Sequence, residues 1–145
     1  MTLRASRVWC ALEGGHTVAE EQSAEENVGS AKAGYAAFSW GDRVAAMVNM
    51  ADDIEWVVPG NSAVSGTYHG KEELGALWTK FAEKSLTIVP EHFLGDEERV
   101  MVLIHMTIDG RSSDRVDILT YRDGKVVKVQ IVQDTLLLQQ IFGTK

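Results

Sequence analysis

The chain is poor in cysteine, proline and positive charge, and it has no long hydrophobic run. Cys10 is the one cysteine among 145 residues, which excludes an internal disulfide and a cysteine-based metal cluster and suits a reducing, cytoplasmic location. The net charge of −7 argues against nucleic acid as a partner, because phosphate binding requires clustered lysine and arginine. No apolar run approaches the roughly 18 residues of a bilayer span, so no membrane partner is expected.

The sequence also lacks the short motifs of well-known catalytic sites. It contains no nucleophile elbow, no phosphate-binding loop and no His-Glu-x-x-His pattern. Its four histidines, His16, His69, His92 and His105, are scattered without the spacing of metal ligands. We therefore predict neither a metal site nor a cofactor, which leaves acid–base chemistry by ionisable side chains in a pocket.

The first 25 residues differ in composition from the rest, and they include an acidic patch that begins at Glu20. We treat residues 1–25 as an N-terminal arm and residues 26–145 as one domain, large enough for a single core. Two interpretations of the arm stay open. In the first, the native start lies at Val18, shortly after a Glu13-Gly14-Gly15 stretch that a ribosome-binding sequence can encode. In the second, the arm is genuine and is either disordered or packed.

Helices are predicted first and strands last. The Ala-rich stretch Val28–Ser39 reads as a helix, and Asp42 caps a second short helix that runs to Met47. Ala51-Asp52-Asp53 turns the chain into a strand at Ile54–Val58, and a Pro-Gly break and a Gly-Thr-Tyr-His-Gly turn follow. The next helix is amphipathic, with one apolar stripe formed by Leu74, Leu77, Trp78 and Phe81.

Four further strands complete the domain. Short Gly- and Asp-containing turns separate them, which is typical of antiparallel hairpins; the predicted strands are Leu86–Leu94, Val100–Ile108, Arg115–Tyr121 and Lys125–Gln133. Grouped helices and hairpin-connected strands indicate an α+β fold, in which helices cover one face of a bent sheet. The second face of this five-strand sheet is also partly apolar, at Val126, Val132 and Leu103.

This order of elements resembles the nuclear transport factor 2-like superfamily, the cone-shaped fold of ketosteroid isomerase, scytalone dehydratase and limonene epoxide hydrolase. The motifs that carry the resemblance look most like the SnoaL-like branch and lie between Val28 and Gly143; they are Trp56-Val57-Val58-Pro59-Gly60, Gly66-Thr67-Tyr68-His69-Gly70, Tyr121-Arg122-Asp123-Gly124-Lys125 and Asp134-Thr135-Leu136-Leu137-Leu138. The resemblance implies a bent mixed or antiparallel sheet covered by three N-terminal helices, a pocketed cystatin-like α+β fold, and a homodimer.

Asp117 is the sharpest candidate for chemistry. Strand alternation puts it on one face with Arg115, Leu119 and Tyr121. If that face points into the cone, burial raises the pKa of Asp117 and lets it donate a proton, and by resemblance it matches the acidic oxyanion-hole residue of ketosteroid isomerase. The alternative is that Arg115 and Asp117 form a solvated surface pair.

Two further positions follow from the same resemblance. Tyr35 roughly matches the tyrosine that completes the oxyanion hole, although a tyrosine on the apolar face of a helix is also an ordinary core residue. Val58 stands where the resemblance places the catalytic aspartate, and valine cannot accept a proton. Steroid isomerisation by that mechanism is therefore not expected.

His92 is predicted to share a face with Ile88, Pro90 and Leu94 and to serve as a base near neutral pH. Gln133 is a candidate hydrogen-bond donor to a ligand. The residues predicted to line a ligand pocket are Trp56, Val58, Trp78, Phe81, Leu119, Tyr121, Ile131 and Gln133.

Three functions remain open. The first is a cofactor-independent isomerase, cyclase or hydrolase that uses Asp117, assisted by Tyr35 or His92, on a hydrophobic polyketide-like or terpenoid-like ligand. The second is a binding module that keeps the pocket without catalysis. The third is a dimeric structural or adaptor protein, which needs a filled cone and an exposed apolar patch.

Overall fold

The computed structural model describes residues 23–145. Its four helices are α2 (Ala24–Ser39), α3 (Arg43–Met47), α4 (Gly70–Ala82) and α5 (Thr135–Phe142). Its strands are β1 (Met50–Val58), β2 (Gly66–His69), β3 (Leu86–Gly95), β4 (Arg99–Ile108), β5 (Arg111–Arg122) and β6 (Lys125–Gln133). Residues 1–22, which include most of the predicted arm and the proposed start at Val18, lie outside the described part.

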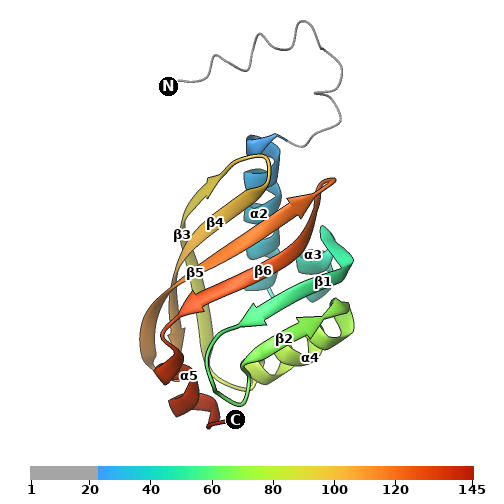
Figure 1. The fold of residues 1–145 in the computed structure, drawn as a ribbon. Helices are drawn as coiled ribbons and strands as arrows, with labels where there is room; N and C mark the ends of the chain where they lie inside the picture. Colours follow the sequence, from blue (N-terminus) through green and yellow to red (C-terminus); the bar gives the residue numbers. More distant parts are fainter. Residues whose placement is uncertain (1–22) are drawn as a thin grey trace, which may run out of the picture.

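The strands form one mixed sheet in the order β2-β1-β6-β5-β4-β3 (Figure 1). β1 and β6 pair in parallel, and the other neighbours are antiparallel. The β4–β5 and β5–β6 hairpins turn at Asp109-Gly110 and Asp123-Gly124, where all four residues have positive φ. Two successive positive φ angles match the twist of the flanking strands, which explains the Asp-Gly pairs in the sequence. The α+β class is confirmed.

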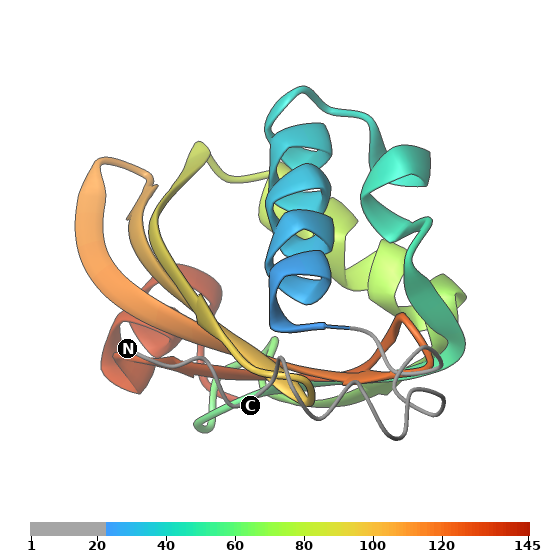
Figure 2. The ribbon, with the colours of Figure 1, turned by 90° about the horizontal axis from the view of Figure 1, so that it is seen from above.

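The sheet is strongly bent, and α2, α3 and α4 lie together on its concave side (Figure 2). α2 packs across β3 and β4, whereas α4 packs against β1 and β2. α2 begins at Ala24, so the predicted domain boundary after residue 25 falls inside its first turn. Ser23 and Glu26 close a capping box there, each bonding the other's backbone N–H at 3.0 Å.

Alternation in the sequence becomes burial in the sheet. Leu74, Leu77, Trp78 and Phe81 of α4 are all buried, so the predicted apolar stripe is confirmed. On β5, burial alternates from residue 115 to residue 121, which confirms the predicted faces of that strand. The inner side chains of β4, β5 and β6 therefore meet the helices in one core.

Several elements differ from the prediction. The Gly-Thr-Tyr-His stretch is not a turn but the short edge strand β2, which pairs with β1 from Glu55–His69 to Val58–Gly66. The sheet consequently has six strands. β1 also starts earlier, at Met50, because an irregular register between Met50 and Glu55 lets the exposed Asp52 and Asp53 lie within the strand.

The C-terminal helix α5 has no counterpart in the prediction. The carboxylate of Asp134 accepts hydrogen bonds from the N–H groups of Leu136 and Leu137 and so caps its start. α5 also explains the Pro-Gly break after β1: Gly60 has φ +95°, and a Cβ on it would lie 2.7 Å from Cβ of Thr135. The break thus lets the backbone pass close to the helix start.

Candidate functional site

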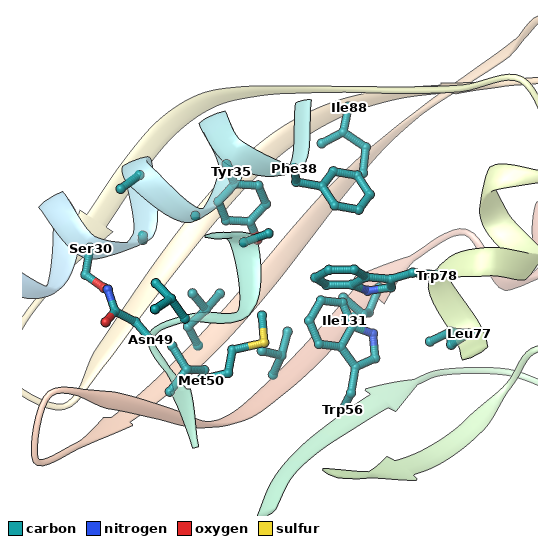
Figure 3. Close-up of a pocket in the computed structure, with 18 of the residues that line it drawn as sticks. Ser30, Tyr35, Phe38, Asn49, Met50, Trp56, Leu77, Trp78, Ile88 and Ile131 are labelled. Atoms are coloured by element: carbon teal, nitrogen blue, oxygen red, sulfur yellow. The ribbon is translucent and has the colours of Figure 1, made fainter. Parts of the chain in front are cut away.

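A cavity of about 100 Å³ lies between the helices and the concave face of the sheet. It is far larger than the ~10–15 Å³ that one water molecule needs. Its walls come from α2, α3, α4, β1, β3, β5 and β6 (Figure 3). All eight side chains that the sequence assigns to a ligand pocket line it: Trp56, Val58, Trp78, Phe81, Leu119, Tyr121, Ile131 and Gln133.

One end of the cavity is aromatic. Trp78 on α4 packs edge-to-face against Trp56 on β1, with ring centroids 5.8 Å apart, and against Phe38 on α2, at 5.0 Å. Figure 3 shows these rings close together, and all three side chains line the cavity. Such edge-to-face clusters present broad apolar surface to a ring of a ligand.

A buried ion pair lies on the cavity side of β5. Arg115 Nε donates to Asp117 Oδ1 at 2.7 Å, and Arg115 Nη2 donates to Asp117 Oδ2 at 3.0 Å. The two residues are 7% and 0% exposed. The guanidinium and carboxylate are therefore joined by two parallel charge-assisted hydrogen bonds in a low-dielectric environment. Burial has the largest single effect and lowers the pKa of Arg115, but the charge and hydrogen bonds of Asp117, together with a contribution from Tyr35, outweigh it and raise that pKa.

Tyr35 joins this pair from the opposite wall. Its hydroxyl on α2 donates to Asp117 Oδ2, and its ring packs edge-to-face on Phe93 at 5.9 Å. Burial, followed by the negative charge of Asp117, raises the pKa of Tyr35 well above its ordinary value of 10.0. Tyr35 is consequently a neutral hydrogen-bond donor at physiological pH.

This geometry changes the role expected of Asp117. The alternative of a solvated surface pair is wrong, because both partners are buried. Both carboxylate oxygens accept hydrogen bonds, two from Arg115 and one from Tyr35, so Asp117 is an acceptor rather than the expected proton donor. Tyr35 and Arg115 line the cavity, with Asp117 behind them.

His92 lies outside the cavity, contrary to expectation. The pairing of β3 with β4 shifts register between Pro90 and His92, so one extra residue enters β3. A bulge of this kind reverses which face later side chains occupy. Ile88 lines the cavity, whereas His92 pairs with Leu103 and is exposed.

A second bulge changes the inward face of β6. The β5–β6 register shifts between Thr120 and Tyr121, so Val126 is buried and lines the cavity. The expectation that Val126 lies on the outer face is therefore wrong. Val132 does lie on the outer face and is 50% exposed.

The lining residues within 23–145 include no aspartate, glutamate, histidine or cysteine. Val58 is buried at the position where the resemblance expects a base. Nor do three such side chains converge to hold a metal ion anywhere in the described part of the chain. The titratable groups at the cavity wall are Tyr35, Arg115 and Tyr121.

Sequence reasoning missed several lining residues. Arg115 shares the predicted strand face of Asp117, but it is not among the side chains that the sequence assigns to the pocket. Phe38 follows Tyr35 by one helical turn, and this spacing could have identified it. Ser30, Asn49 and Met50 carried no comparable signal, because a bend after α3 brings the last two to the cavity.

Comparisons with known proteins agree with this architecture. The family model of the SnoaL-like domain matches residues 31–129. An NTF2-like protein from Burkholderia xenovorans LB400 is 32% identical, with a TM-score of 0.71 over 86% of this chain and 99% of that one. Bal32a from a soil-derived mobile gene cassette is 23% identical, with a TM-score of 0.74 over 82% and 97%. No curated protein matches the chain.

A third similar structure is TerC co-crystallised with polyporic acid. It is 27% identical to this chain, with a TM-score of 0.68 over 79% of this chain and 96% of that one.

Within residues 23–145, no helix combines the length and apolar character of a bilayer span.

The ion pair makes a strong prediction for stability. Asp117→Asn leaves the Arg115 charge buried without a counter-charge, and we expect the free energy of unfolding to fall by about 3–5 kcal/mol in urea denaturation. The triple variant Tyr35→Phe, Arg115→Met, Asp117→Leu removes all three polar partners together, and its free energy of unfolding should fall much less. Asp114→Asn, at an exposed position of β5, is the matched control. A small loss in Asp117→Asn alone would contradict the buried pair.

The tyrosines predict an unusual alkaline titration. Burial raises the pKa of each of the three tyrosines, Tyr35, Tyr68 and Tyr121, above 10.0. Above that pH the unfolded chain loses phenol protons before the folded chain does, so the free energy of unfolding falls as pH rises past about 10. Ultraviolet absorbance should show late ionisation in the native protein and ordinary ionisation in urea. Tyr35→Phe should remove the part of the absorbance change that appears at the highest pH. A native titration centred at the ordinary tyrosine pKa of 10.0 would contradict the prediction.

Proposed function

The chain belongs to the family of SnoaL-like domains, and on this premise we propose that it binds a small, largely apolar organic molecule inside its cone and polarises one oxygen of that molecule. The groups that act are Tyr35, Asp117 and Arg115, which we call the charged triad. The reaction class is a cofactor-independent isomerisation or cyclisation. One observation carries the proposal: a buried ion pair with a tyrosine donor stands at the wall of a largely apolar cavity.

The triad is suited to stabilise negative charge on oxygen. Arg115 donates to Asp117 through Nε and Nη2, while its Nη1 lies 3.8 Å from the weak acceptor Met106 Sδ. The N–H groups of Nη1 therefore remain available to a stronger acceptor on a ligand. A fixed cationic donor at the wall of a largely apolar cavity stabilises an enolate or phenolate without rearranging.

Tyr35 supplies the route for a proton. A ligand hydroxyl that donates to the Tyr35 oxygen is linked through the Tyr35 O–H to Asp117 Oδ2. The ligand proton passes to Tyr35 as the Tyr35 proton passes to Asp117, which leaves a neutral carboxylic acid and a ligand oxyanion beside Arg115. This relay uses Asp117 as the base and does not need a carboxylate at Val58.

The aromatic end of the cavity determines what apolar group the ligand carries. Phe38, Trp56 and Trp78 offer aromatic edges and faces, which favour a ring system over a flexible polar chain. TerC, a structure similar to this one, was co-crystallised with polyporic acid, which supports a small organic acid as the kind of ligand.

The test uses p-(p-nitrophenyl)phenol, whose visible absorbance reports its ionisation. We expect binding to lower the pKa of the bound phenol, because Arg115 and the relay favour the phenolate. Tyr35→Phe should weaken binding about tenfold, equivalent to roughly 1.4 kcal/mol, and should reduce the shift of the phenol pKa. Val44→Ala, an exposed change on α3, is the control.

The outcomes separate the three functions. Binding with a lowered phenol pKa supports the proposal. Binding with an unchanged pKa contradicts the polarising role and favours a passive binding module. Absence of binding contradicts both the polarising enzyme and the passive binding module, and it favours an adaptor protein.

We also propose a homodimer formed through the convex face of the sheet. Direct strand partners share a face, and two rows of such partners, Val132–Val116–Leu103 and Ile118–Met101–Leu94, make a continuous apolar patch there. Met101 and Leu94 are 41% and 60% exposed. Exposed patches of this kind are typical of protein interfaces.

Light scattering with size-exclusion chromatography checks this proposal. We expect twice the chain mass for the native protein and the monomer mass for Met101→Glu, because a charge at the patch centre opposes its burial. Val44→Glu adds the same charge at an exposed position of α3 and should keep the dimer. A native monomer at micromolar concentration would contradict the proposal.

A further inference from the structure

From the geometry we infer a second polar subsite in the cavity, made by Tyr121, Ser30 and Asn49, which binds a second oxygen function of the ligand. The ligand is therefore elongated, with one oxygen at the charged triad, another at this subsite, and an apolar middle. This inference rests on the proposed function and specifies the ligand class that the same cavity accepts.

The Tyr121 hydroxyl is the observation that points to a ligand. Tyr121 is 6% exposed and lines the cavity, yet its buried Oη has no hydrogen-bond partner among residues 23–145. Buried hydroxyls are usually paired, because an unpaired one has lost its water without compensation. Burial raises the pKa of Tyr121. The nearby Ser30 hydroxyl lowers that pKa by a smaller amount, so the net shift is upward, and the Tyr121 hydroxyl keeps its proton and is available as a donor.

Ser30 and Asn49 complete the subsite. Asn49 Nδ2 donates to Ser30 Oγ at 3.0 Å, which links α2 to the segment before β1, and both side chains line the cavity. Ser30 lies near Tyr121, although the two hydroxyls do not meet hydrogen-bond geometry. Figure 3 shows Ser30 and Asn49 together at the end of the cavity remote from Trp56 and Trp78.

The backbone sets the spacing of the two polar groups. Ser30 and Tyr35 are five residues apart on α2, or about 7.5 Å along the helix axis. Tyr121 is four residues from Asp117 on the same face of β5, or about 13 Å along the strand. Between them the wall is apolar, with Leu119 and Val129. The two ligand oxygens are thus separated by roughly 8–13 Å, which suits linked or fused rings better than a single ring.

The chemistry of the second oxygen also follows. The subsite contains hydroxyl and amide groups and no charged side chain, so it does not neutralise an anion. Tyr121 has a free donor, which requires an acceptor on the ligand. A carbonyl, ether or hydroxyl oxygen meets that requirement, whereas a carboxylate or phosphate at this end would be buried without a counter-charge.

The test compares two probes that differ in one group, p-phenylphenol and p,p′-biphenol. Calorimetry should show that the native protein binds the diol about tenfold more tightly than the mono-phenol. Tyr121→Phe should abolish that preference, so that the variant binds the two probes with equal affinity. Tyr35→Phe is the comparison variant, which should weaken both probes.

Stability provides an independent readout. Because Tyr121→Phe removes a buried hydroxyl that has no partner, the melting temperature of the ligand-free variant should not fall. A lowered melting temperature would mean that the hydroxyl has a structural partner, and it would contradict the subsite.

The outcomes also distinguish the subsite from the proposed function. If the mono-phenol binds but the diol shows no preference, or if Tyr121→Phe retains the preference, the subsite is wrong while the proposed function stands. If neither probe binds the native protein, both are wrong.

Discussion

Two opposite charges on one face of β5 have to stay together, because either alone would be buried without compensation. Arg115 and Asp117 satisfy each other in the strand, and the Tyr35 hydroxyl adds a contact from this pair to α2. Helix and sheet are thereby fixed relative to each other at a polar point within an apolar core. The width of the cone on this side depends on that contact.

The rest of the cavity follows from what faces the triad. α4 contributes Trp78 to the cavity wall, where its ring packs between Trp56 of β1 and Phe38 of α2. The interior therefore has a charged wall, an aromatic end and a neutral polar end at Ser30 and Asn49. Each region restricts a different part of a ligand, so specificity does not depend on any one side chain.

The sequence predicted most of this architecture wherever periodicity was uninterrupted. The stripe of α4 and the alternation of β5 identified the inward side chains correctly, because burial selects apolar residues at the period of each element. Errors followed the two bulges. Near Glu91 and Val127 an additional residue reverses the alternation, and no residue type marks such an insertion, so His92 and Val126 were assigned to the wrong faces. β2 and α5 were missed because four and eight residues are too few for a periodic signal. Arg115 was not assigned to the pocket for another reason: charge on a strand usually indicates solvent, and only the tertiary structure reveals that the pair of Arg115 and Asp117 is buried.

The parallel pairing of β1 with β6 has a consequence for the order in which the molecule is made. Trp56 on β1 lies beside Val129 on β6, so the middle of the sheet joins an early strand to the last one. On the ribosome, the hairpins of β3, β4 and β5 can form from neighbouring segments, whereas the inner wall beside β1 waits for nearly the whole chain to emerge. Until then the aromatic side chains of β1 and α4 have no sheet to cover them. In the nascent chain, the residues that later line the cavity therefore stay uncovered for the longest time, and they carry the greatest risk of aggregation.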